Sequence, residues 1–398
     1  MKVLLLENIH PVAKEKLESA GFEVDLLTHS PEPSEMDDLF SNYEVLGIRS
    51  KTKLTAEILN RNKHLKAIGC FCIGTNQVDL QAAKKIALSV FNAPHSNTRS
   101  VAELVIAEMV MLARQLGDRN TDAHQGRWNK SAKGANEIRG KKLGIIGYGH
   151  IGSQVSVLAE SFGLDVSFYD TTKKLPLGNA TAVESIEELL ATSDFVTLHV
   201  PETSETQNMI SSKELTLMKK GSYLINASRG TVVVIKDLVE ALKSKHLGGA
   251  AVDVFPTEPA SNKEEFYSAL QNLENVILTP HIGGSTEEAQ HSIGLEVSES
   301  LIRYIKSGST AGSVNLPNVE AAPRDKMYRI VNIHKNVPGV LGKINGHISS
   351  TGANIEAQYL ATDEEIGYLI IDVGGENLDQ LSDEINNLDE NILTRVLR

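Results

Sequence analysis

The segment KKLGIIGYGHIG, residues 141–152, limits the possible folds of this chain more than any other part of it. An apolar run leads into the spacing Gly147-x-Gly149-x-x-Gly152, and a helical pattern starts at Ser153. Glycines at these places permit a tight turn, close approach of the backbone to a pyrophosphate, and close packing of helix on strand. The helix N terminus offers N–H groups and a positive dipole end to phosphates. We therefore predict a parallel β-α-β unit that binds a dinucleotide.

The next apolar run ends in Asp170, 18 residues after the third glycine. A carboxylate at this place accepts hydrogen bonds from both hydroxyls of a ribose and repels a 2′-phosphate. Asp170 therefore favours NAD as the cofactor. Lys173 and Lys174 follow closely and leave NADP open as the alternative.

Short apolar runs alternate with helical patterns twice along the chain, which is typical of parallel sheets covered by helices on both faces. We expect the strands of the first sheet at residues 3–7, 23–27, 45–50 and 65–74. The strands of the second sheet are expected at residues 143–147, 165–170, 195–200, 222–228, 249–254 and 275–280. Between them, residues 98–117 form one helical pattern that is apolar nearly all round, which predicts a buried helix. The predicted fold class is α/β with two doubly wound parallel sheets.

Residues 311–326 interrupt this alternation with a short polar segment that contains proline, which we interpret as a linker. Residues 326–398 then follow the order strand, helix, strand, strand, helix, strand. This order is that of a ferredoxin-like split unit. The chain is thus expected to end in a third, smaller domain.

The overall charge and the cysteines exclude some classes of function. The formal net charge is −12, from 39 basic and 51 acidic residues, and such a chain repels the phosphate backbone of nucleic acids. No run of roughly 20 apolar residues is present to span a membrane, so we expect a cytoplasmic protein. Cys70 and Cys72 would point to opposite faces of one strand, which suits neither a disulfide nor a metal site. We expect two reduced thiols and no metal ion.

Three segments that follow strands of the second sheet carry candidate catalytic side chains. They are INASRG (225–230), DVFPTEP (253–259) and TPHIGG (279–284). An open parallel sheet binds its ligand at the carboxyl ends of the strands, so these segments would deliver their side chains to one cleft. Oxidation of a secondary alcohol needs a base for the hydroxyl proton and a cation for the carboxylate and the developing carbonyl.

We assign the base to His281, whose ordinary pKa lies near 6.5. Glu258 would fix the tautomer of the imidazole and favour its charged form, and Arg229 would hold a carboxylate with its planar fork. The predicted reaction is hydride transfer to or from the 2-hydroxyl carbon of a small acid.

At these motifs the chain resembles the D-2-hydroxyacid dehydrogenase family over essentially its whole length. The segments that carry the resemblance are GYGHIG, INASRGT, DVFPTEPA and LTPHIGGSTEEAQ. The resemblance implies that Arg229, Glu258 and His281 are catalytic. It also implies cofactor contacts by the fingerprint glycines and by His150, Ile151, Asp170, Ala227, Ser228, Asp253, Gly283 and Gly284. It further implies a discontinuous substrate-binding domain, made of residues 1–96 and 285–322, with the cofactor domain (97–284) inserted between them.

The resemblance is closest to members that oxidise D-3-phosphoglycerate, the first step of serine biosynthesis. It implies that Arg49 and Ser50 of the segment GIRSKT hold the substrate, with Lys51, Asn76 and Asn97 as further contacts. Positive charge gathered there would explain how an acidic protein binds a phosphate dianion. The alternative interpretation of GIRSKT is a solvated basic turn. Relatives carry arginine where Lys51 stands, and lysine keeps the charge but loses the fork.

Residues 326–398 resemble an ACT module, a small regulatory domain that binds amino acids. The resemblance implies an effector site for serine at His334, Asn336 and Asn354, between two modules. A purely structural role in dimerisation is the alternative. Ala321, Ala322 and Pro323 stand where relatives have a hinge of paired glycines, which argues against a hinge-type inhibition. Two dimerising surfaces, on the cofactor domain and on this module, predict a homotetramer.

Two other functions fit the same motifs. One is a dehydrogenase of the same family that acts on glycerate, lactate or 2-hydroxyglutarate. The other, from a different class, is an NAD-sensing corepressor that binds partner proteins without catalysis. Such corepressors lack the C-terminal module and carry disordered tails, and neither property matches this chain.

Overall fold

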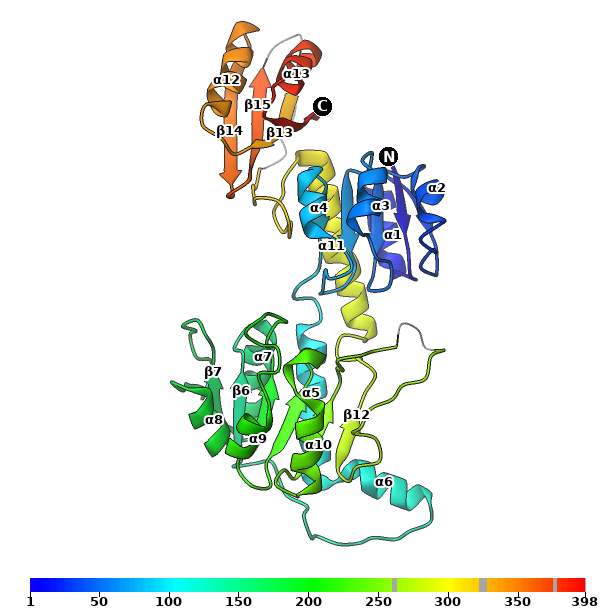
Figure 1. Cartoon of the computed structure of the whole chain (residues 1–398), viewed down its shortest axis with the longest axis vertical. Helices are drawn as coiled ribbons and strands as arrows, with labels where there is room; N and C mark the ends of the chain where they lie inside the picture. Colours follow the sequence, from blue (N-terminus) through cyan, green and yellow to red (C-terminus); the bar gives the residue numbers. More distant parts are fainter. Residues whose placement is uncertain (260–262, 322–327, 375–377, 398) are drawn as a thin grey trace. The chain divides into compact units, whose positions relative to one another are not determined.

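The structure, a computed structural model, describes residues 1–259, 263–321, 328–374 and 378–397. The chain divides into two compact units, one made of residues 1–96 and 290–398 and the other of residues 97–289. Parallel sheets in both units and an antiparallel sheet near the C terminus confirm the predicted fold class (Figure 1). The described part of the chain has no helix that combines the length and apolar character needed to cross a bilayer.

The first unit contains a five-stranded parallel sheet with the strand order β2-β1-β3-β4-β5. Its strands are β1 (Lys2–Leu5), β2 (Glu23–Leu26), β3 (Val45–Ile48), β4 (Ala67–Cys70) and β5 (Ser89–Phe91). The helices that accompany it are α1 (Pro11–Ser19), α2 (Met36–Phe40), α3 (Ala56–Arg61), α4 (Leu80–Lys85) and the long α11 (Glu287–Ser307). Apolar side chains of alternating strand positions feed two separate core clusters, one on each face of the sheet. This explains why the strands are apolar throughout.

The second unit contains a seven-stranded parallel sheet with the order β12-β11-β10-β9-β6-β7-β8. Its strands are β6 (Lys142–Ile146), β7 (Asp165–Tyr169), β8 (Thr181–Ala182), β9 (Phe195–Leu198), β10 (Tyr223–Asn226), β11 (Gly249–Val252) and β12 (Val276–Leu278). The helices are α5 (Thr98–Arg114), α6 (Leu116–His124), α7 (His150–Ser161), α8 (Ile186–Thr192), α9 (Ser212–Leu217) and α10 (Ile235–Lys243), with a 3-10 turn at Gly230–Val232. The chain order reverses direction between β6 and β9, which is where such sheets bind ligands.

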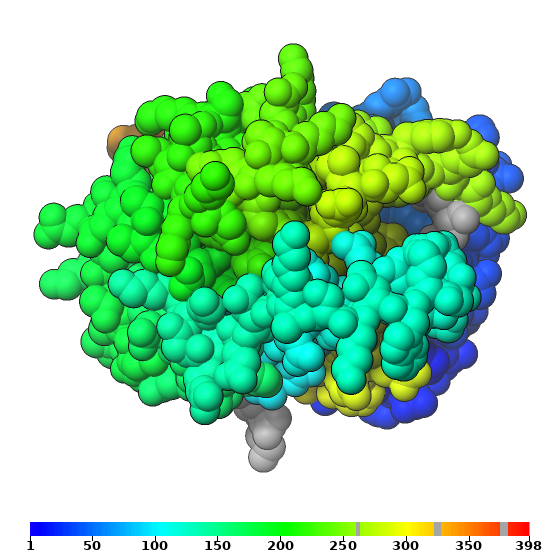
Figure 2. Space-filling view, turned by 90° about the horizontal axis from the view of Figure 1, so that it is seen from below, coloured from blue at the N-terminus to red at the C-terminus, as the bar shows by residue number. Residues whose placement is uncertain are grey.

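The single helix expected over residues 98–117 is in fact two helices. Gln115 adopts a left-handed conformation, with φ of 54°, and separates α5 from α6. Eight residues of α5 are buried, whereas none of α6 is. In Figure 2 the cyan segment that includes α6 lies on the surface, and Trp128 beyond it exposes 88% of its area. The prediction of a buried helix is therefore confirmed for α5 and wrong for α6.

The C-terminal module, residues 328–397, has the predicted order of elements. They are β13 (Tyr328–Lys335), α12 (Val340–Ser350), β14 (Asn354–Thr362), β15 (Ile366–Gly374), α13 (Leu378–Asn386) and β16 (Asn391–Leu397). Antiparallel pairing gives the sheet order β14-β15-β13-β16. One face of this sheet packs on α12 and α13, and the other face shares a core cluster with α11. The linker positions Ala322 and Pro323 lie outside the described residues.

Side chains of the C-terminal module satisfy the backbone carbonyls at the end of α11. Arg395 donates to the carbonyl of Tyr304 at 3.2 Å, Arg329 to that of Ser307 at 2.9 Å and the Tyr368 hydroxyl to that of Gly308 at 2.6 Å. Two of these donors are guanidinium groups, which are favourable at the negative end of a helix dipole. The module therefore completes a helix that packs with the five-stranded sheet of the same unit.

Candidate active site

The fingerprint turn after β6 has the geometry that a dinucleotide pyrophosphate requires. Gly147 has φ of 91°, and a Cβ atom there would stand 2.4 Å from the His199 carbonyl oxygen. At Gly152 a Cβ atom would stand 2.2 Å from the carbonyl oxygen of Gly147. At Gly149, the N-cap of α7, no atom lies within 4 Å of the place of a Cβ. Open space over a helix N terminus fits a phosphate group, and His150 and Ile151 begin that helix.

Asp170 directly follows β7, as predicted. Its carboxylate accepts hydrogen bonds from the backbone N–H of Tyr148 at 2.8 Å and from the N–H and hydroxyl of Thr172, both at 2.9 Å. Partial burial raises the pKa of this carboxyl, but these donors outweigh that effect and lower it. Asp170 is therefore a charged acceptor tied to the fingerprint turn, with lone pairs remaining for a ribose. The two features together fit NAD.

His281 and Glu258 form a hydrogen-bonded pair in the same unit. Nδ1 of His281 lies 2.8 Å from Oε2 of Glu258, and the other carboxylate oxygen accepts the N–H of Phe255 at 3.0 Å. The side chains are 52% and 35% exposed, so both remain accessible. With Nδ1–H donated to the carboxylate, Nε2 of the imidazole is left as the proton acceptor. This is the arrangement of a general base with an orienting group.

The pair shifts the pKa values of both partners towards the charged forms. The hydrogen bond to Glu258 raises the pKa of His281, against burial and the positive charge of Arg229, which lower it. Burial raises the pKa of Glu258, but the hydrogen bonds from His281 and Phe255 and the charge of Arg229 prevail and lower it. The guanidinium of Arg229 is itself held by a hydrogen bond of 2.7 Å to the Ser228 carbonyl.

The backbone around His281 is held by Asp253, which directly follows β11. The Asp253 carboxylate is 2% exposed and accepts the Thr279 hydroxyl at 2.6 Å and the N–H groups of Ile282 and Gly283 at 2.8 and 2.9 Å. His281 itself has φ of 54°, a strained value for a non-glycine residue. Such strain persists where the surroundings fix the conformation, which is common at functional sites.

The turn that carries Arg229 is organised by Asn226, the last residue of β10. The Asn226 side chain accepts the N–H and the hydroxyl of Ser228 at 3.1 and 2.8 Å, and donates to the Arg229 carbonyl at 3.0 Å. A Cβ atom on Gly230 would stand 2.0 Å from the carbonyl carbon of Phe255. Gly230 therefore allows this turn to touch the segment that carries Glu258.

The structure brings the predicted Arg229, Glu258, His281 and Asp253 together in one unit, with the fingerprint turn at the same edge of its sheet. Ser228 and Gly283, expected cofactor contacts, are buried, whereas Ala227 and Gly284 are partly exposed. Sequence analysis did not assign a role to Asn226, although it stands inside the quoted motif INASRG.

Glu108 on α5 is a second residue of this region that was not predicted. It is 1% exposed, and neither carboxylate oxygen has a hydrogen-bond partner among the described residues. Burial, followed by the charge of Asp253, raises its pKa to about 8. A lone acidic residue within an apolar helical pattern was the available signal.

The proposed substrate loop belongs to the other unit and follows β3. Arg49 is partly exposed, and Ser50 and Lys51 are exposed. Asn76 is exposed in the loop after β4, whereas Asn97 belongs to the unit of the catalytic residues, where its amide nitrogen lies near Gly284.

The predicted effector residues do not gather in one copy of the C-terminal module. His334 is 3% exposed, and its Nδ1 lies 2.9 Å from the Asn332 side chain. His334 pairs with Gly367 of β15, whereas Asn354 pairs with Gly374 at the other end of that strand. Seven residues of a strand span about 23 Å. A single ligand would therefore need Asn354 from a second module, which agrees with the expected site between two modules.

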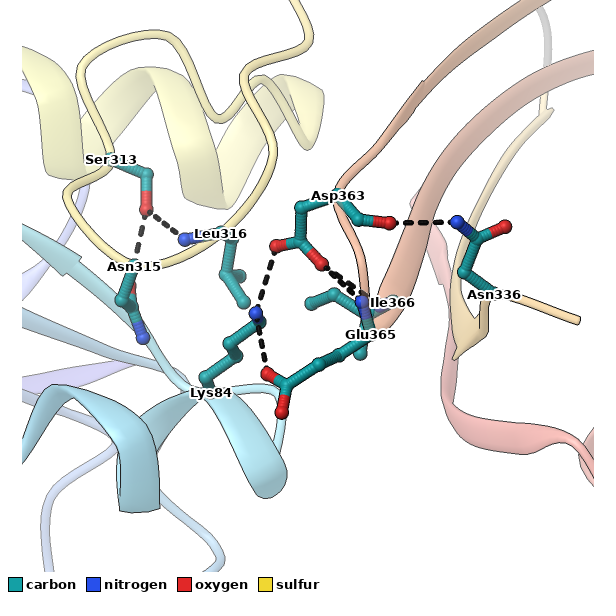
Figure 3. A network of polar contacts seen from close by, with 8 residues as sticks. All are labelled: Lys84, Ser313, Asn315, Leu316, Asn336, Asp363, Glu365 and Ile366. Atoms are coloured by element: carbon teal, nitrogen blue, oxygen red, sulfur yellow. Dashed lines mark hydrogen bonds and ion pairs between the residues drawn. The ribbon is translucent and has the colours of Figure 1, made fainter.

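Asn336 is connected to helix α4 through a short polar network (Figure 3). Its side-chain amide donates to the Asp363 carbonyl at 2.7 Å. The Asp363 and Glu365 carboxylates lie 2.9 and 2.6 Å from Nζ of Lys84, which comes from α4. Burial lowers the pKa of Lys84, but the two carboxylates outweigh it and raise the pKa. The predicted effector residue Asn336 and helix α4 are thus linked by one loop.

A dinucleotide fingerprint beside a histidine, carboxylate and arginine group defines an NAD-dependent dehydrogenase that acts on a hydroxy acid. Residues 106–283 match the family described as "D-isomer specific 2-hydroxyacid dehydrogenase, NAD binding domain". Residues 330–392 match an "AHAS small subunit-like ACT domain".

Proteins of similar sequence match this chain over almost its whole length. The D-3-phosphoglycerate dehydrogenase of Dictyostelium discoideum is 52% identical over 100% of this chain and 97% of its own length. That of Escherichia coli K12 is 54% identical over 94% of this chain and 91% of its own. A D-lactate dehydrogenase of Aquifex aeolicus, solved with NAD and lactic acid, is 28% identical with a TM-score of 0.68, over 79% of this chain and 100% of its own. The chain belongs to the D-2-hydroxyacid dehydrogenase family, and the predictions of an NAD-dependent oxidoreductase and of an ACT domain are confirmed.

The pKa shift of His281 predicts a pH dependence that differs between the two directions. Oxidation needs the neutral imidazole and reduction the charged one. Because Glu258 raises the His281 pKa, we expect Glu258→Gln to lower it again. The acid limb of kcat/KM for oxidation and the alkaline limb for reduction should then both move to lower pH.

This pH dependence is measured as paired profiles of the wild type and the variant. Glu274→Gln, at a carboxylate that is 89% exposed, serves as the control and should leave both profiles in place. Profiles of Glu258→Gln that coincide with those of the wild type would contradict the assignment of the pair.

Proposed function

We propose that this protein is a D-3-phosphoglycerate dehydrogenase, which oxidises D-3-phosphoglycerate to 3-phosphohydroxypyruvate in the first step of serine biosynthesis. The observation that carries the proposal is the His281–Glu258 hydrogen bond of 2.8 Å beside Arg229, in a chain about half identical to relatives of that name. The phosphate finds suitable cationic groups in Arg49 and Lys51, with Ser50 as a neutral donor.

In this proposal His281 accepts the 2-hydroxyl proton at Nε2, while Glu258 stabilises the imidazolium that forms. Arg229 binds the substrate carboxylate and polarises the carbonyl oxygen as it develops. When bound, NAD supplies the acceptor for the hydride that leaves C2. In the reverse direction His281 returns the proton to the carbonyl oxygen.

The experiment is a substrate panel followed at the absorbance band of the reduced nicotinamide. Phosphoglycerate should give the highest kcat/KM, with glycerate, lactate and 2-hydroxyglutarate below it. A second carboxylate suits the same cations, so 2-hydroxyglutarate should be the best of the others. Higher kcat/KM for any unphosphorylated acid would favour the runner-up dehydrogenase, and no turnover at all would favour a binding protein.

For the assembly, the proposal is a cytoplasmic homotetramer. Cys70 and Cys72 are free thiols, as expected in a reducing compartment. Trp128 is 88% exposed on the surface segment beyond α6, where a second copy would cover it. Sedimentation at equilibrium measures the mass directly, and a monomer would contradict the assembly.

The proposed effector is serine, bound between ACT modules of two chains. We expect serine to inhibit, and Asn336→Ala to raise the serine concentration for half effect by about five- to tenfold, because one hydrogen bond contributes about 1–1.5 kcal/mol. Asn387→Ala, at an exposed position of the same module, is the matched control. Rates unchanged at millimolar serine would contradict the regulatory role.

A further inference from the structure

The loop that carries Arg49, Ser50 and Lys51 is held from behind by an acidic residue that the reaction itself does not use. We propose that Glu7 is a positioning residue, which fixes the backbone of residues 49–52 so that their side chains are presented to the substrate phosphate. This inference rests on the proposed function, because it assumes that the loop binds an anion. Neither the motifs nor the catalytic group assigns a role to Glu7.

The Glu7 carboxylate accepts three backbone N–H groups of this one loop. Oε1 lies 3.1 Å from the nitrogen of Arg49 and 2.8 Å from that of Thr52, and Oε2 lies 2.9 Å from that of Lys51. Glu7 is 7% exposed, so water competes little for these bonds. Hydrogen bonds to a buried charged group are stronger than those between neutral groups.

The backbone of Glu7 is itself in an uncommon conformation. Its φ is 61° and that of Asn8 is 55°, so two successive non-glycine residues are left-handed. Each such residue costs of order 1 kcal/mol and persists only where other contacts determine it. The neighbouring backbone is anchored, since Leu6 donates to the Gly47 carbonyl at 2.8 Å and Asn8 to that of Leu27 at 3.3 Å. This turn directs the Glu7 side chain under the loop.

Gln77 holds the same loop through the backbone carbonyl of Arg49. Its side-chain nitrogen donates to the Arg49 carbonyl at 2.7 Å, and the residue is 9% exposed. Both the N–H and the carbonyl of Arg49 are thus bound by buried side chains. The backbone from which the guanidinium extends is therefore fixed on two sides.

These contacts determine how the loop can bind an anion. Many phosphate sites use a nest of backbone N–H groups. Here Glu7 occupies the N–H groups of Arg49, Lys51 and Thr52, so these three groups cannot bind the phosphate, and we expect side chains to supply most of the contacts. The negative charge of Glu7 also lies behind two cations. Removal of the Glu7 charge alone would favour binding of an anionic substrate. We nevertheless expect weaker binding, because the loop also loses the hydrogen bonds that fix its conformation.

The test compares Glu7→Gln with the wild type in steady-state kinetics and in amide hydrogen exchange. Glutamine has the same shape, but its NH₂ group would face a backbone N–H. We expect the KM for phosphoglycerate to rise about ten- to a hundredfold, the factor for one charge-assisted hydrogen bond, with kcat within about twofold. The KM for NAD should not change. The peptide that contains residues 49–52 should lose its protection from exchange.

Gln77→Met provides a second variant that removes the other contact, and it carries the same test where Glu7→Gln does not fold. Glu57→Gln, at a side chain 79% exposed in the same unit, is the control. A folded Glu7→Gln with unchanged exchange and unchanged KM for phosphoglycerate overturns the inference, as does an equal rise in the KM for NAD. If the wild type itself fails to oxidise phosphoglycerate, the proposed function is lost, and the exchange of the loop amides alone decides the role of Glu7.

Discussion

His281→Ala is expected to reduce kcat by about a thousandfold, since a positioned general acid–base typically contributes 10²–10⁴. The affinity for NAD should remain nearly unchanged, because the fingerprint turn and Asp170 do not depend on the imidazole. Turnover is measured in the direction of oxidation, and NAD binding by the quenching of intrinsic fluorescence or by calorimetry. His124→Ala, at an exposed histidine of α6, is the control and should behave as the wild type.

A comparable loss of cofactor binding in His281→Ala would mean that His281 has a structural role. That result would be understandable from its left-handed backbone and its position in the loop held by Asp253. Substitution by asparagine, which tolerates that conformation better than alanine, separates the two explanations. A chemical role predicts the same loss of kcat in both variants.

Arg329→Met is expected to lower the free energy of unfolding by about 3–5 kcal/mol, the usual cost of removing one member of a buried ion pair. The Arg329 and Asp372 side chains are only 7% and 1% exposed, and two nitrogens of the guanidinium lie 2.6 and 2.9 Å from the carboxylate oxygens. The variant also removes the donor to the Ser307 carbonyl. Urea unfolding followed by circular dichroism measures the change.

The double variant Arg329→Met with Asp372→Leu should recover a large part of this loss, because both charges of the buried pair are then removed together. Lys14→Met, at an exposed ion pair with Glu18 in the same unit, is the control and should have no measurable effect. A single variant as stable as the wild type would contradict a contribution of this ion pair to the stability.

Much of the catalytic unit could be predicted because its signals are local. The glycine spacing at 147–152 and the three motifs that end successive strands each combine a strand with the turn chemistry after it, and parallel strands bring their carboxyl ends to one edge. The separation of α5 from α6 could not be predicted in this way. Gln115 carries no signal for a left-handed conformation, and the burial that stops after Arg114 depends on the tertiary fold.

The roles of the residues that position the site, Glu7 and Asn226, could not be predicted from the sequence either. Glu7 follows an apolar strand, where an acidic residue is usually solvated, and its partners are 42 to 45 residues away. Asn226 was visible within its motif, but its three hydrogen bonds depend on the path of the turn. The contacts of Glu7 join segments distant in sequence, and a single sequence contains no measure of such contacts.

The way α11 ends has a consequence for any shortened form of the chain. A version truncated after Ala321 would expose Tyr304 and the apolar side chains around it to water, and three carbonyl groups would lose their donors. Removal of the C-terminal module is therefore expected to destabilise the end of α11 and to leave an apolar surface that favours aggregation.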